Sequence, residues 1–355
     1  MDMPNKKIRV PAEKLERFAA RAFQAAGVPE EEGAVAGRML VNTDMRGVVT
    51  HGMMRLAPWY VWPIIEKRIN GRAQIQTLGE TVSTAALDGD GGLGFIVGDR
   101  AMRLAVEKAK TSGIGVVNVR NVGHFGAAFN YPLIAAEQGM IGFCMTNTPP
   151  WMAAPGTGTP AIGTNPLAFA APAGNKPPFL LDMSCTVVAA AKALREDLDI
   201  PEGWVIDRQG QPVREQSKII MGETSLLPLG GVPSHGAYKG YGLGIMVEIL
   251  TAMLAGSSCG RLHFQNGGTT WCSFFGAIDI NAFLPLTSFY NKMEEMVDML
   301  ESLPDKLPGV EHLYVPGGHG AEVAEDNRVN GVPLAKSIIT EHRALAEELN
   351  ISIDY

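Results

Sequence analysis

The two ends of the chain carry apolar residues at helical spacing. Within residues 11–26, apolar positions recur every three or four residues, which predicts an amphipathic helix. Gly27 ends this pattern and Pro29 opens a second helix, because glycine favours the position just after a helix and proline favours its first turn. Residues 286–303 and 334–349 show the same periodicity, so the C-terminal region is also expected to be helical.

The middle of the chain alternates short apolar runs with segments of helical periodicity. Runs of strand length predict strands at residues 82–87, 115–119, 141–145, 167–171 and 179–182. Helices are expected at residues 100–110, 132–138, 187–195 and 241–254, the last of them strongly apolar. Strands separated by helices favour an α/β fold with a layered core.

Composition and charge narrow the possible functions. The 355 residues carry a formal net charge of -7 without a long Lys/Arg run, which argues against a nucleic-acid or anionic-membrane partner. No apolar run approaches the roughly 20 residues that cross a bilayer, and the opening MDMPNKKIRV lacks the apolar centre of a signal peptide, so we expect a cytoplasmic protein. The four cysteines lie far apart without metal-ligand spacing, which favours reduced thiols over disulfides or a metal site.

One segment, RGVVTHGMMRL at residues 46–56, places His51 four positions before Arg55. In a helix, these two side chains would share a face and point into the same space. An imidazole could then move a proton beside a guanidinium that holds a carboxylate through two hydrogen bonds. A helix start with a surface arginine fits the same residues equally well.

Residues 89–94, GDGGLG, match the glycine pattern of dinucleotide-binding proteins and precede a predicted helix. The preceding strand is short and polar, however, and no acidic residue ends the next strand, where a ribose hydroxyl would need one. Arg120 could meet a 2′-phosphate in such a fold, but one arginine does not restore the assignment. We therefore interpret residues 89–94 as a glycine-rich turn.

Five motifs occur in the order seen in one known family. They are DMRGVVTHGMMRL, NVGHFGAA, GTNPLAFAAP, LDMSCT with IPEGWVIDRQG, and YKGYGLGIMVEIL. From about Leu15 onward, the chain resembles the malate/L-lactate dehydrogenase family of the non-Rossmann kind. This family includes ureidoglycolate, sulfolactate and 2,3-diketogulonate oxidoreductases and piperideine-2-carboxylate reductase. The resemblance implies NAD or NADP as the cofactor, bound without a Rossmann fingerprint.

The resemblance also implies an architecture. It is a layered α/β/α core with a mixed sheet, a non-Rossmann nicotinamide-cofactor fold, with helical N- and C-terminal segments. Residues 81–285 would form the α/β cofactor-binding core, and residues 1–80 with 286–355 a helical region for substrate and dimer contacts. The family implies a homodimer, and the apolar helix at residues 241–254 offers surface for it, although a buried core helix would give the same pattern.

Roles in catalysis and substrate binding follow from the same resemblance. His51 corresponds to the family's acid/base histidine, and Thr50 replaces the usual serine while keeping a hydroxyl for a relay. Arg55 would hold the substrate carboxylate. Thr164 and Asn165 resemble contacts to the substrate or to the nicotinamide amide, with a proline-terminated turn as the alternative interpretation.

Cofactor contacts are implied in four segments. They comprise His124, Phe125, Gly126 and Ala127; Asp182, Met183, Ser184 and Thr186; Tyr238 and Lys239; and Gly318 and His319. Ser184 and Thr186 offer hydroxyls at an expected helix start, where they would suit a pyrophosphate or simply cap the helix. Two segments depart from the family pattern: Tyr238 stands where histidine is frequent, and PGGHG at residues 316–320 lacks the usual glutamate.

We therefore predict an NAD(P)-dependent oxidoreductase that interconverts a small 2-hydroxy acid and its 2-oxo acid. Arg55 would hold the carboxylate, His51 would donate a proton as hydride arrives at C2, and Asp182 would stabilise the imidazolium. A structural aspartate at a strand end fits Asp182 equally well. A cyclic imine carboxylate reductase is the alternative enzyme, and a catalytically silent carboxylate-binding or assembly protein is the alternative outside catalysis.

Overall fold

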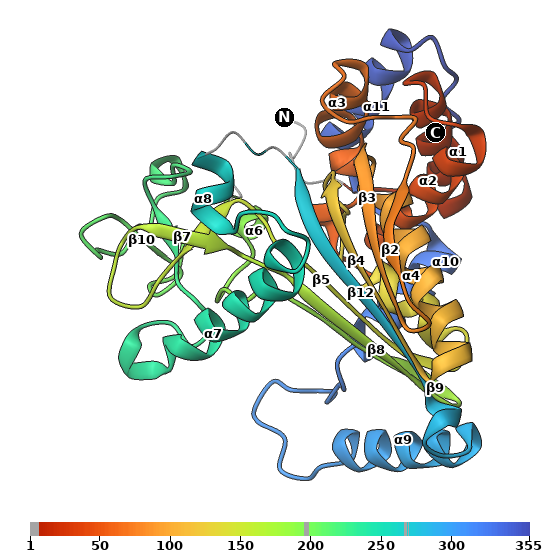
Figure 1. Ribbon diagram of the computed structural model, residues 1–355. Helices are drawn as coiled ribbons and strands as arrows, with labels where there is room; N and C mark the ends of the chain where they lie inside the picture. Colours follow the sequence, from red (N-terminus) through yellow and green to blue (C-terminus); the bar gives the residue numbers. More distant parts are fainter. Residues whose placement is uncertain (1–6, 195–198, 266–267, 269) are drawn as a thin grey trace.

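The computed structural model describes residues 7–194, 199–265, 268 and 270–355, which fold into two lobes (Figure 1). The larger lobe is built on a seven-stranded sheet and the smaller lobe on a four-stranded sheet. A two-stranded sheet joins segments near the two ends of the chain.

The seven-stranded sheet is mixed, as predicted. Its strands, in spatial order, are β2 (Gln76–Glu80), β3 (Thr84–Gly92), β4 (Ile114–Val122), β12 (Trp271–Asp279), β5 (Met140–Thr146), β8 (Leu167–Ala173) and β9 (Lys176–Met183). Within this sheet, β3 and β4 pair in parallel and all other neighbours pair antiparallel. The Rossmann fold, in contrast, has a mostly parallel sheet.

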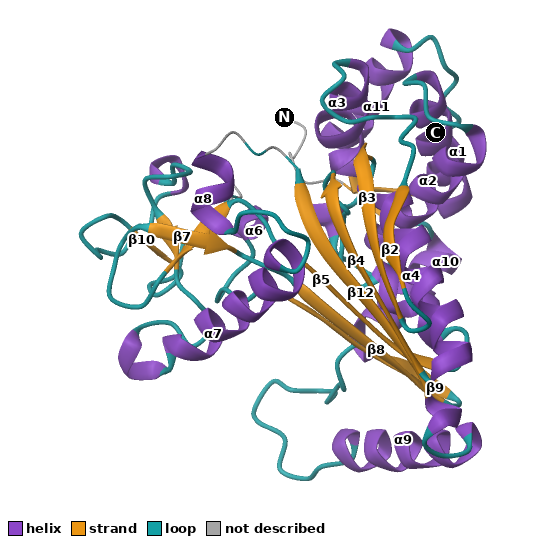
Figure 2. Cartoon of the chain, viewed as in Figure 1, coloured by secondary structure: helices purple, strands orange, loops and turns teal. Residues whose placement is uncertain are grey.

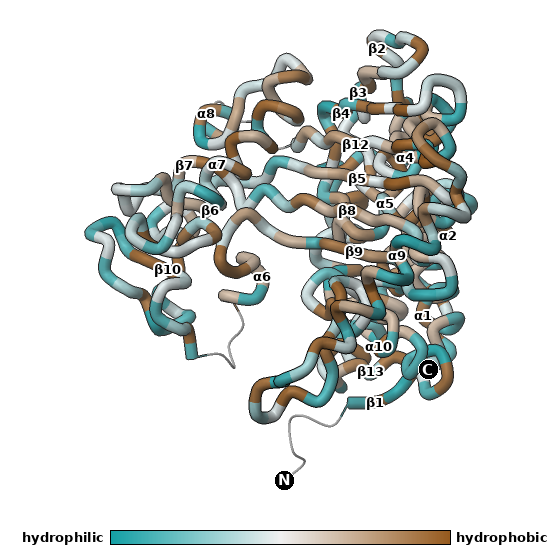
Figure 3. The backbone as a smooth tube through the Cα atoms, turned by 90° about the horizontal axis from the view of Figure 1, so that it is seen from below, coloured by the Kyte–Doolittle hydropathy of each residue, from teal (hydrophilic) through white to brown (hydrophobic). Residues whose placement is uncertain are grey.

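Helices cover both faces of the large sheet, which confirms the layered α/β/α core. They are α4 (Gly94–Ser112) and α5 (Asn130–Ala136) on one face, and α7 (Ala237–Glu248) with its π-helical continuation Ile249–Met253 on the other. The two faces are visible on β12, because Phe275 joins the main apolar core whereas the adjacent Phe274 packs with Val247 of α7. In Figure 3, β12, β5, β8 and β9 run side by side from the large lobe toward the small lobe.

Most helices from the two ends of the chain gather on one side of the large sheet (Figure 2). They are α1 (Ala12–Ala25), α2 (Glu30–Met45), α3 (Trp62–Ile65), α10 (Gly318–Asn330) and α11 (Lys336–Glu348). Helix α9 (Leu286–Glu301) lies apart, at the lower end of β8 and β9 in this view. Strand β1 (Lys7–Val10) pairs with β13 (Val332–Ala335), and α10 packs against α2. Both ends of the chain therefore support the segment that carries His51.

The small lobe is formed by the middle of the chain. Its strands, in spatial order, are β10 (Val205–Ile206), β11 (Ser225–Leu226), β6 (Pro150–Ala153) and β7 (Pro160–Gly163), and its helices include α6 (Ala190–Ala193) and α8 (Gly260–Gln265). A separate apolar cluster that contains Val188, Ile200 and Leu226 stabilises this lobe.

Two helix boundaries expected from the sequence are wrong. The helix at residues 187–195 shrinks to α6, because the Val187 N–H donates to the Leu227 carbonyl at 3.0 Å instead of entering a helix; residue 195 lies outside the described residues. The expected domain division after residue 80 falls between the paired strands β2 and β3 and stays a prediction. The helix expected at residues 334–349 begins only at Lys336, because β13 pairs with β1.

Residues 89–94 end β3 and begin α4, and β3, α4 and β4 form a parallel β-α-β unit. The glycines nevertheless allow neighbouring segments of the chain to pack closely. A side chain at Gly94 would collide with the carbonyl oxygens of Gly123 and His124. The loop that carries His124 thus packs directly on the helix start, and this packing explains Gly94 without a bound dinucleotide. Arg120, the possible phosphate ligand, pairs with Asp88 at 2.9 Å.

Two expectations from composition concern membranes and cysteines. No helix among the described residues is long and apolar enough to span a membrane. The cysteines are free thiols, of which Cys144, Cys185 and Cys272 are buried and Cys259 is partly exposed.

Candidate active site

The segment after α2 brings His51 and Arg55 together without a continuous helix. It forms two short 3-10 turns, Val49–His51 and Met53–Arg55, which are separated by Gly52 in an extended conformation with φ -92° and ψ -147°. The predicted helical i, i+4 geometry is therefore wrong. The two side chains are nonetheless neighbours, since both bond Thr50, His51 through the Thr50 hydroxyl and Arg55 through the Thr50 carbonyl.

His51 is held as a neutral imidazole. Its Nδ1 shares a hydrogen bond of 3.0 Å with the Thr50 hydroxyl, the partner that the sequence predicts. Burial and, second, the positive charge of Arg55 lower the pKa of His51 to about 4. At neutral pH the ring is thus prepared to accept a proton.

In the part of the chain that the structure describes, the guanidinium of Arg55 is bonded through Nε only, which leaves its two Nη atoms for a ligand. Its Nε donates to the Thr50 carbonyl at 2.9 Å, which fixes the orientation of the side chain. The guanidinium carbon lies 4.4 Å from the centre of the Trp59 ring, a cation–π contact. No hydrogen bond of the terminal Nη atoms occurs among the described residues, so this edge can bind a carboxylate.

His124 lies beside His51, with ring centroids 5.9 Å apart and planes inclined by 15°. Its Nδ1 accepts hydrogen bonds from the Tyr60 hydroxyl at 2.7 Å and from the Gly126 N–H at 3.3 Å, so the ring proton is on Nε2. Burial, followed by the charges of His51 and Arg55, holds the pKa of His124 well below its ordinary value. His124 is therefore a neutral hydrogen-bond donor beside the acid/base candidate.

Three aromatic residues of the site were not predicted. Trp59 and Trp271 contact the His124 ring edge-on at centroid distances of 4.8 and 5.5 Å, and Tyr60 is its hydrogen-bond partner. Trp59 and Tyr60 follow the RGVVTHGMMRL segment directly, so proximity to that motif could have indicated them. Trp271 gives no such signal, because it reaches His124 only through the pairing of β12 with β4.

Asp182 stands at the end of β9 and is exposed to solvent, although dense surroundings desolvate it and raise its pKa to about 6. Its Oδ2 accepts a hydrogen bond from the Phe129 N–H at 2.9 Å. The described contacts contain no direct hydrogen bond between Asp182 and His51, so the predicted support of the imidazole does not occur by direct contact. Asp182 instead holds the end of the loop that begins at His124.

Thr164 and Asn165 differ in their availability. Asn165 is completely buried, its Nδ2 donates to the Gly244 carbonyl and to Glu248 at 3.0 Å each, and its Oδ1 accepts from the Thr148 N–H at 3.1 Å. In this structure the amide of Asn165 is engaged by the protein itself, and its role as a substrate ligand stays a prediction. Thr164 is partly exposed and its hydroxyl lies 3.2 Å from that of Thr148.

The cofactor residues predicted after His124 are mainly packing residues. Phe125 and Ala127 are buried, and Gly126 has φ +75° with no room for a side chain against the Phe95 ring. The requirement for a small residue at Gly126 thus comes from an aromatic neighbour within the protein.

Ser184 and Thr186 do not begin a helix, since α6 starts only at Ala190. The Ser184 hydroxyl donates to the Thr186 carbonyl at 3.2 Å, and Thr186, which is buried, donates to the Val188 carbonyl at 2.7 Å. The predicted helix start at Ser184 and Thr186 is therefore wrong, whereas their contact with a pyrophosphate stays a prediction. Met183 and Ser184 remain partly exposed.

The last predicted cofactor residues lie at the starts of two helices. One helix lies beside the segment that follows β9, and the other lies beside β9 itself. Tyr238 and Lys239 are exposed in the first turn of α7, which lies beside Ser184 because Gly240 packs against the Cys185 carbonyl. Gly318 and His319 begin α10, which is anchored to β9 by the hydrogen bond from the Leu180 N–H to the Pro316 carbonyl at 2.9 Å. The structure thus brings these segments to one strand.

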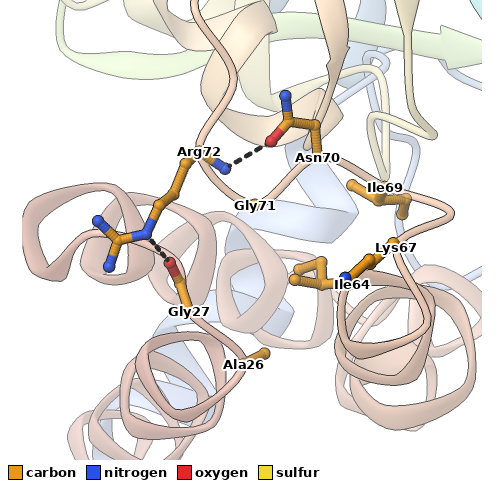
Figure 4. Close-up of a pocket in the computed structure, with 8 residues that line it drawn as sticks. All are labelled: Ala26, Gly27, Ile64, Lys67, Ile69, Asn70, Gly71 and Arg72. Atoms are coloured by element: carbon orange, nitrogen blue, oxygen red, sulfur yellow. Dashed lines mark hydrogen bonds between the residues drawn. The ribbon is translucent and has the colours of Figure 1, made fainter.

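A surface groove of about 380 Å³ lies apart from these residues (Figure 4). Its lining consists of Ala26, Gly27, Ile64, Lys67, Ile69, Asn70, Gly71 and Arg72. In the close-up, Arg72 donates to the Gly27 carbonyl at 2.9 Å and thereby closes one wall. None of the predicted site residues lines this groove.

Comparisons with known proteins agree with the motifs. The model of a family described as Malate/L-lactate dehydrogenase matches residues 10–342. The chain is 40% identical to a malate dehydrogenase from Pyrococcus horikoshii over 97% of this chain and 96% of the relative, and 36% identical to an L-sulfolactate dehydrogenase from Methanocaldococcus jannaschii over 92% and 93%. The crystal structure of a malate dehydrogenase from Entamoeba histolytica superposes with a TM-score of 0.94 at 30% identity, covering 99% of this chain and 100% of that one. The names of two other relatives state a cofactor. A sulfolactate dehydrogenase from Chromohalobacter salexigens is named with NADP(+), and a ureidoglycolate dehydrogenase from Escherichia coli is named with NAD(+).

Proposed function

Because the chain belongs to the malate/L-lactate dehydrogenase family, we propose that it is an NAD(P)-dependent oxidoreductase that interconverts a small 2-hydroxy acid and its 2-oxo acid. The observation that carries this proposal is the neighbouring pair of His51 and Arg55, a proton-handling ring beside a guanidinium with a free edge.

Arg55 binds the substrate carboxylate and so places C2 and its oxygen beside the His51 ring. In the oxidation direction, neutral His51 accepts the hydroxyl proton, and Thr50 holds the ring in position through Nδ1. Acceptance of the hydride from C2 is the chemistry that a bound nicotinamide cofactor would supply. The Nε2–H of His124 is a further donor for the substrate oxygen or carboxylate.

In the reduction direction, His51 must first be protonated. The Arg55 charge opposes this step in the free protein and helps to hold the pKa of His51 at about 4. A bound carboxylate neutralises that charge, so substrate binding raises the pKa of His51 and promotes uptake of the proton that the reaction consumes. The same residues thus couple substrate binding to proton uptake.

The residues near β9 provide donors that fit a dinucleotide. Lys239 offers an exposed ammonium for a phosphate, and Ser184 offers a hydroxyl on the adjacent segment. The loop from His124 to Phe129 contacts His51 at one end and Asp182 of β9 at the other, and these residues would hold the nicotinamide end. His319 and the Gly318 N–H at the start of α10 are additional candidates for cofactor contacts.

We also propose that the protein is a cytoplasmic homodimer. Support comes from apolar side chains on the outer side of α7 and its continuation, where Met246, Ile249, Met253 and Leu254 are 38% to 61% exposed. Ile245 and Leu250 point inward and pack on the apolar cluster around Val247. Sedimentation at low micromolar concentration tests this proposal, and a monomer with full specific activity would contradict it.

The test of the enzymatic function is turnover of a panel of 2-oxo acids and cyclic imine carboxylates with NADH and with NADPH, followed by nicotinamide absorbance. We expect oxidation of the reduced cofactor with at least one 2-oxo acid. His51→Ala is the matched variant, with kcat lowered by roughly 10²- to 10⁴-fold and cofactor binding retained. Turnover of imines alone would favour the imine reductase, and no turnover of any compound would favour a silent binding protein.

A further inference from the structure

Met53, which lies between His51 and Arg55, is held by side chains from distant parts of the chain. Its N–H donates to Asp44 Oδ2 at 2.6 Å, and its carbonyl lies 3.1 Å from His342 Nε2. The Met53 side chain is 1% exposed within the main core. Both backbone polar groups of Met53 are therefore bound by buried side chains.

Asp44 shapes the break between the two 3-10 turns. It is 3% exposed at the end of α2, and its carboxylate lies so close to Gly52 that any side chain at Gly52 would collide with it. The end of α2 is itself fixed by α10, because Asn327 Nδ2 donates to the carbonyls of Asp44 at 3.4 Å and Met45 at 3.0 Å. The contact with Asp44 thus explains why a glycine stands at this break between the turns.

His342 fixes the other side of Met53 and is itself oriented by Tyr355. Because Nε2 must donate to the Met53 carbonyl, Nδ1 carries no proton and accepts from the Tyr355 hydroxyl at 2.9 Å. Both rings pack against Phe18, at centroid distances of 5.3 and 5.7 Å. Burial also lowers the pKa of His342 to about 4, in keeping with a neutral ring that has one donor and one acceptor.

We propose that Asp44, His342 and Tyr355 are positioning residues that set the relation between the imidazole of His51 and the guanidinium of Arg55. The proposal rests on the function proposed above, in which these two side chains act on the same substrate. A shift of Met53 moves the arginine that binds the carboxylate relative to the ring that handles the proton. The separation of the two groups then no longer matches the distance between the substrate's carboxylate and its C2 oxygen.

Two variants at His342 separate positioning from general stability. Glutamine can place a donor near the position of Nε2, whereas leucine has similar bulk and no donor. We expect His342→Leu to lower kcat/KM for the preferred 2-oxo acid by roughly 10- to 100-fold, as a displacement of about 1 Å in a reacting group does. His342→Gln should recover most of this loss, and Tyr355→Phe should lower kcat/KM several-fold. Tyr290→Phe, on α9, is the matched control with native kinetics.

Cofactor affinity and hydrogen exchange complete the test. The Kd for the reduced cofactor should stay within about two-fold of native in all four variants, while amide exchange of residues 48–56 becomes faster in His342→Leu and stays native in His342→Gln. Native kinetics and native exchange in folded His342→Leu would overturn the proposal, as would equal loss in the leucine and glutamine variants. If the native protein turns over no substrate, the proposed function fails, and the exchange data still decide whether His342 orders the segment.

Discussion

The low pKa of His51 leads to a pH dependence that differs between the two directions of the reaction. With a pKa of about 4, only about one ring in a thousand is protonated at pH 7 in the substrate-free protein, which corresponds to about 4 kcal/mol. Reduction needs this protonated ring and oxidation needs the neutral one. We therefore expect kcat/KM for reduction to fall about ten-fold per pH unit from about pH 5 to 9, and kcat/KM for oxidation to stay level over the same range.

The assay is a pair of kcat/KM profiles measured with the same acid pair and followed by nicotinamide absorbance. Asp182, with a pKa of about 6, and Asp44, with a pKa of about 7, also titrate in this window. Profiles of Asp44→Asn and Asp182→Asn identify any bend that comes from these carboxyls. A reduction profile that stays level up to about pH 6.5 and falls only above it would refute the reasoning, because it would place His51 at its ordinary pKa.

Three further predictions concern single residues. Arg55→Lys should raise KM for the carboxylate substrate at least ten-fold in steady-state assays, because an ammonium cannot reproduce the planar fork; an unchanged KM would remove Arg55 from the substrate site. Gly91→Ala, at φ +63° in open space, should lower the melting temperature and leave the cofactor Kd unchanged, whereas Lys239→Ala should weaken cofactor binding in the same titration; the reverse pattern would restore the glycine fingerprint. Burial raises the pKa of Asp44 to about 7 from an ordinary value near 4, so the native protein loses stability as pH rises through this range. Asparagine does not ionise, so the melting temperature of Asp44→Asn minus that of the native protein should be larger above pH 7 than at pH 5. Melting curves without such a pH-dependent difference would contradict the shifted pKa.

Local patterns predicted the elements of the fold better than the details of the site. The apolar runs that became β4, β5, β8 and β9 were recognised because a buried strand needs no distant partner to show its composition. Trp271 could not be placed from local pattern, since its contact with His124 depends on how β12 pairs with β4.

Gly52 and Asn165 both show how distant residues determine local structure. The spacing of His51 and Arg55 suggested a helix. Gly52, however, packs against the carboxylate of Asp44, eight positions earlier in the chain. Asn165 sits in a motif that resembles a substrate contact, yet its amide is taken up by Gly244 and Glu248, about eighty residues away. In both cases tertiary hydrogen bonds determine the role of the residue.

The packing of Gly94 against the carbonyl of His124 also has an electrostatic consequence. The first N–H groups of the 19-residue helix α4 carry the positive end of its macrodipole, which acts within about one turn of the helix start. That end lies beside the backbone carbonyl oxygens of Gly123 and His124, whose partial negative charge it attracts. A helix start that resembles a phosphate-binding site in sequence thus applies its dipole to the backbone of the protein itself.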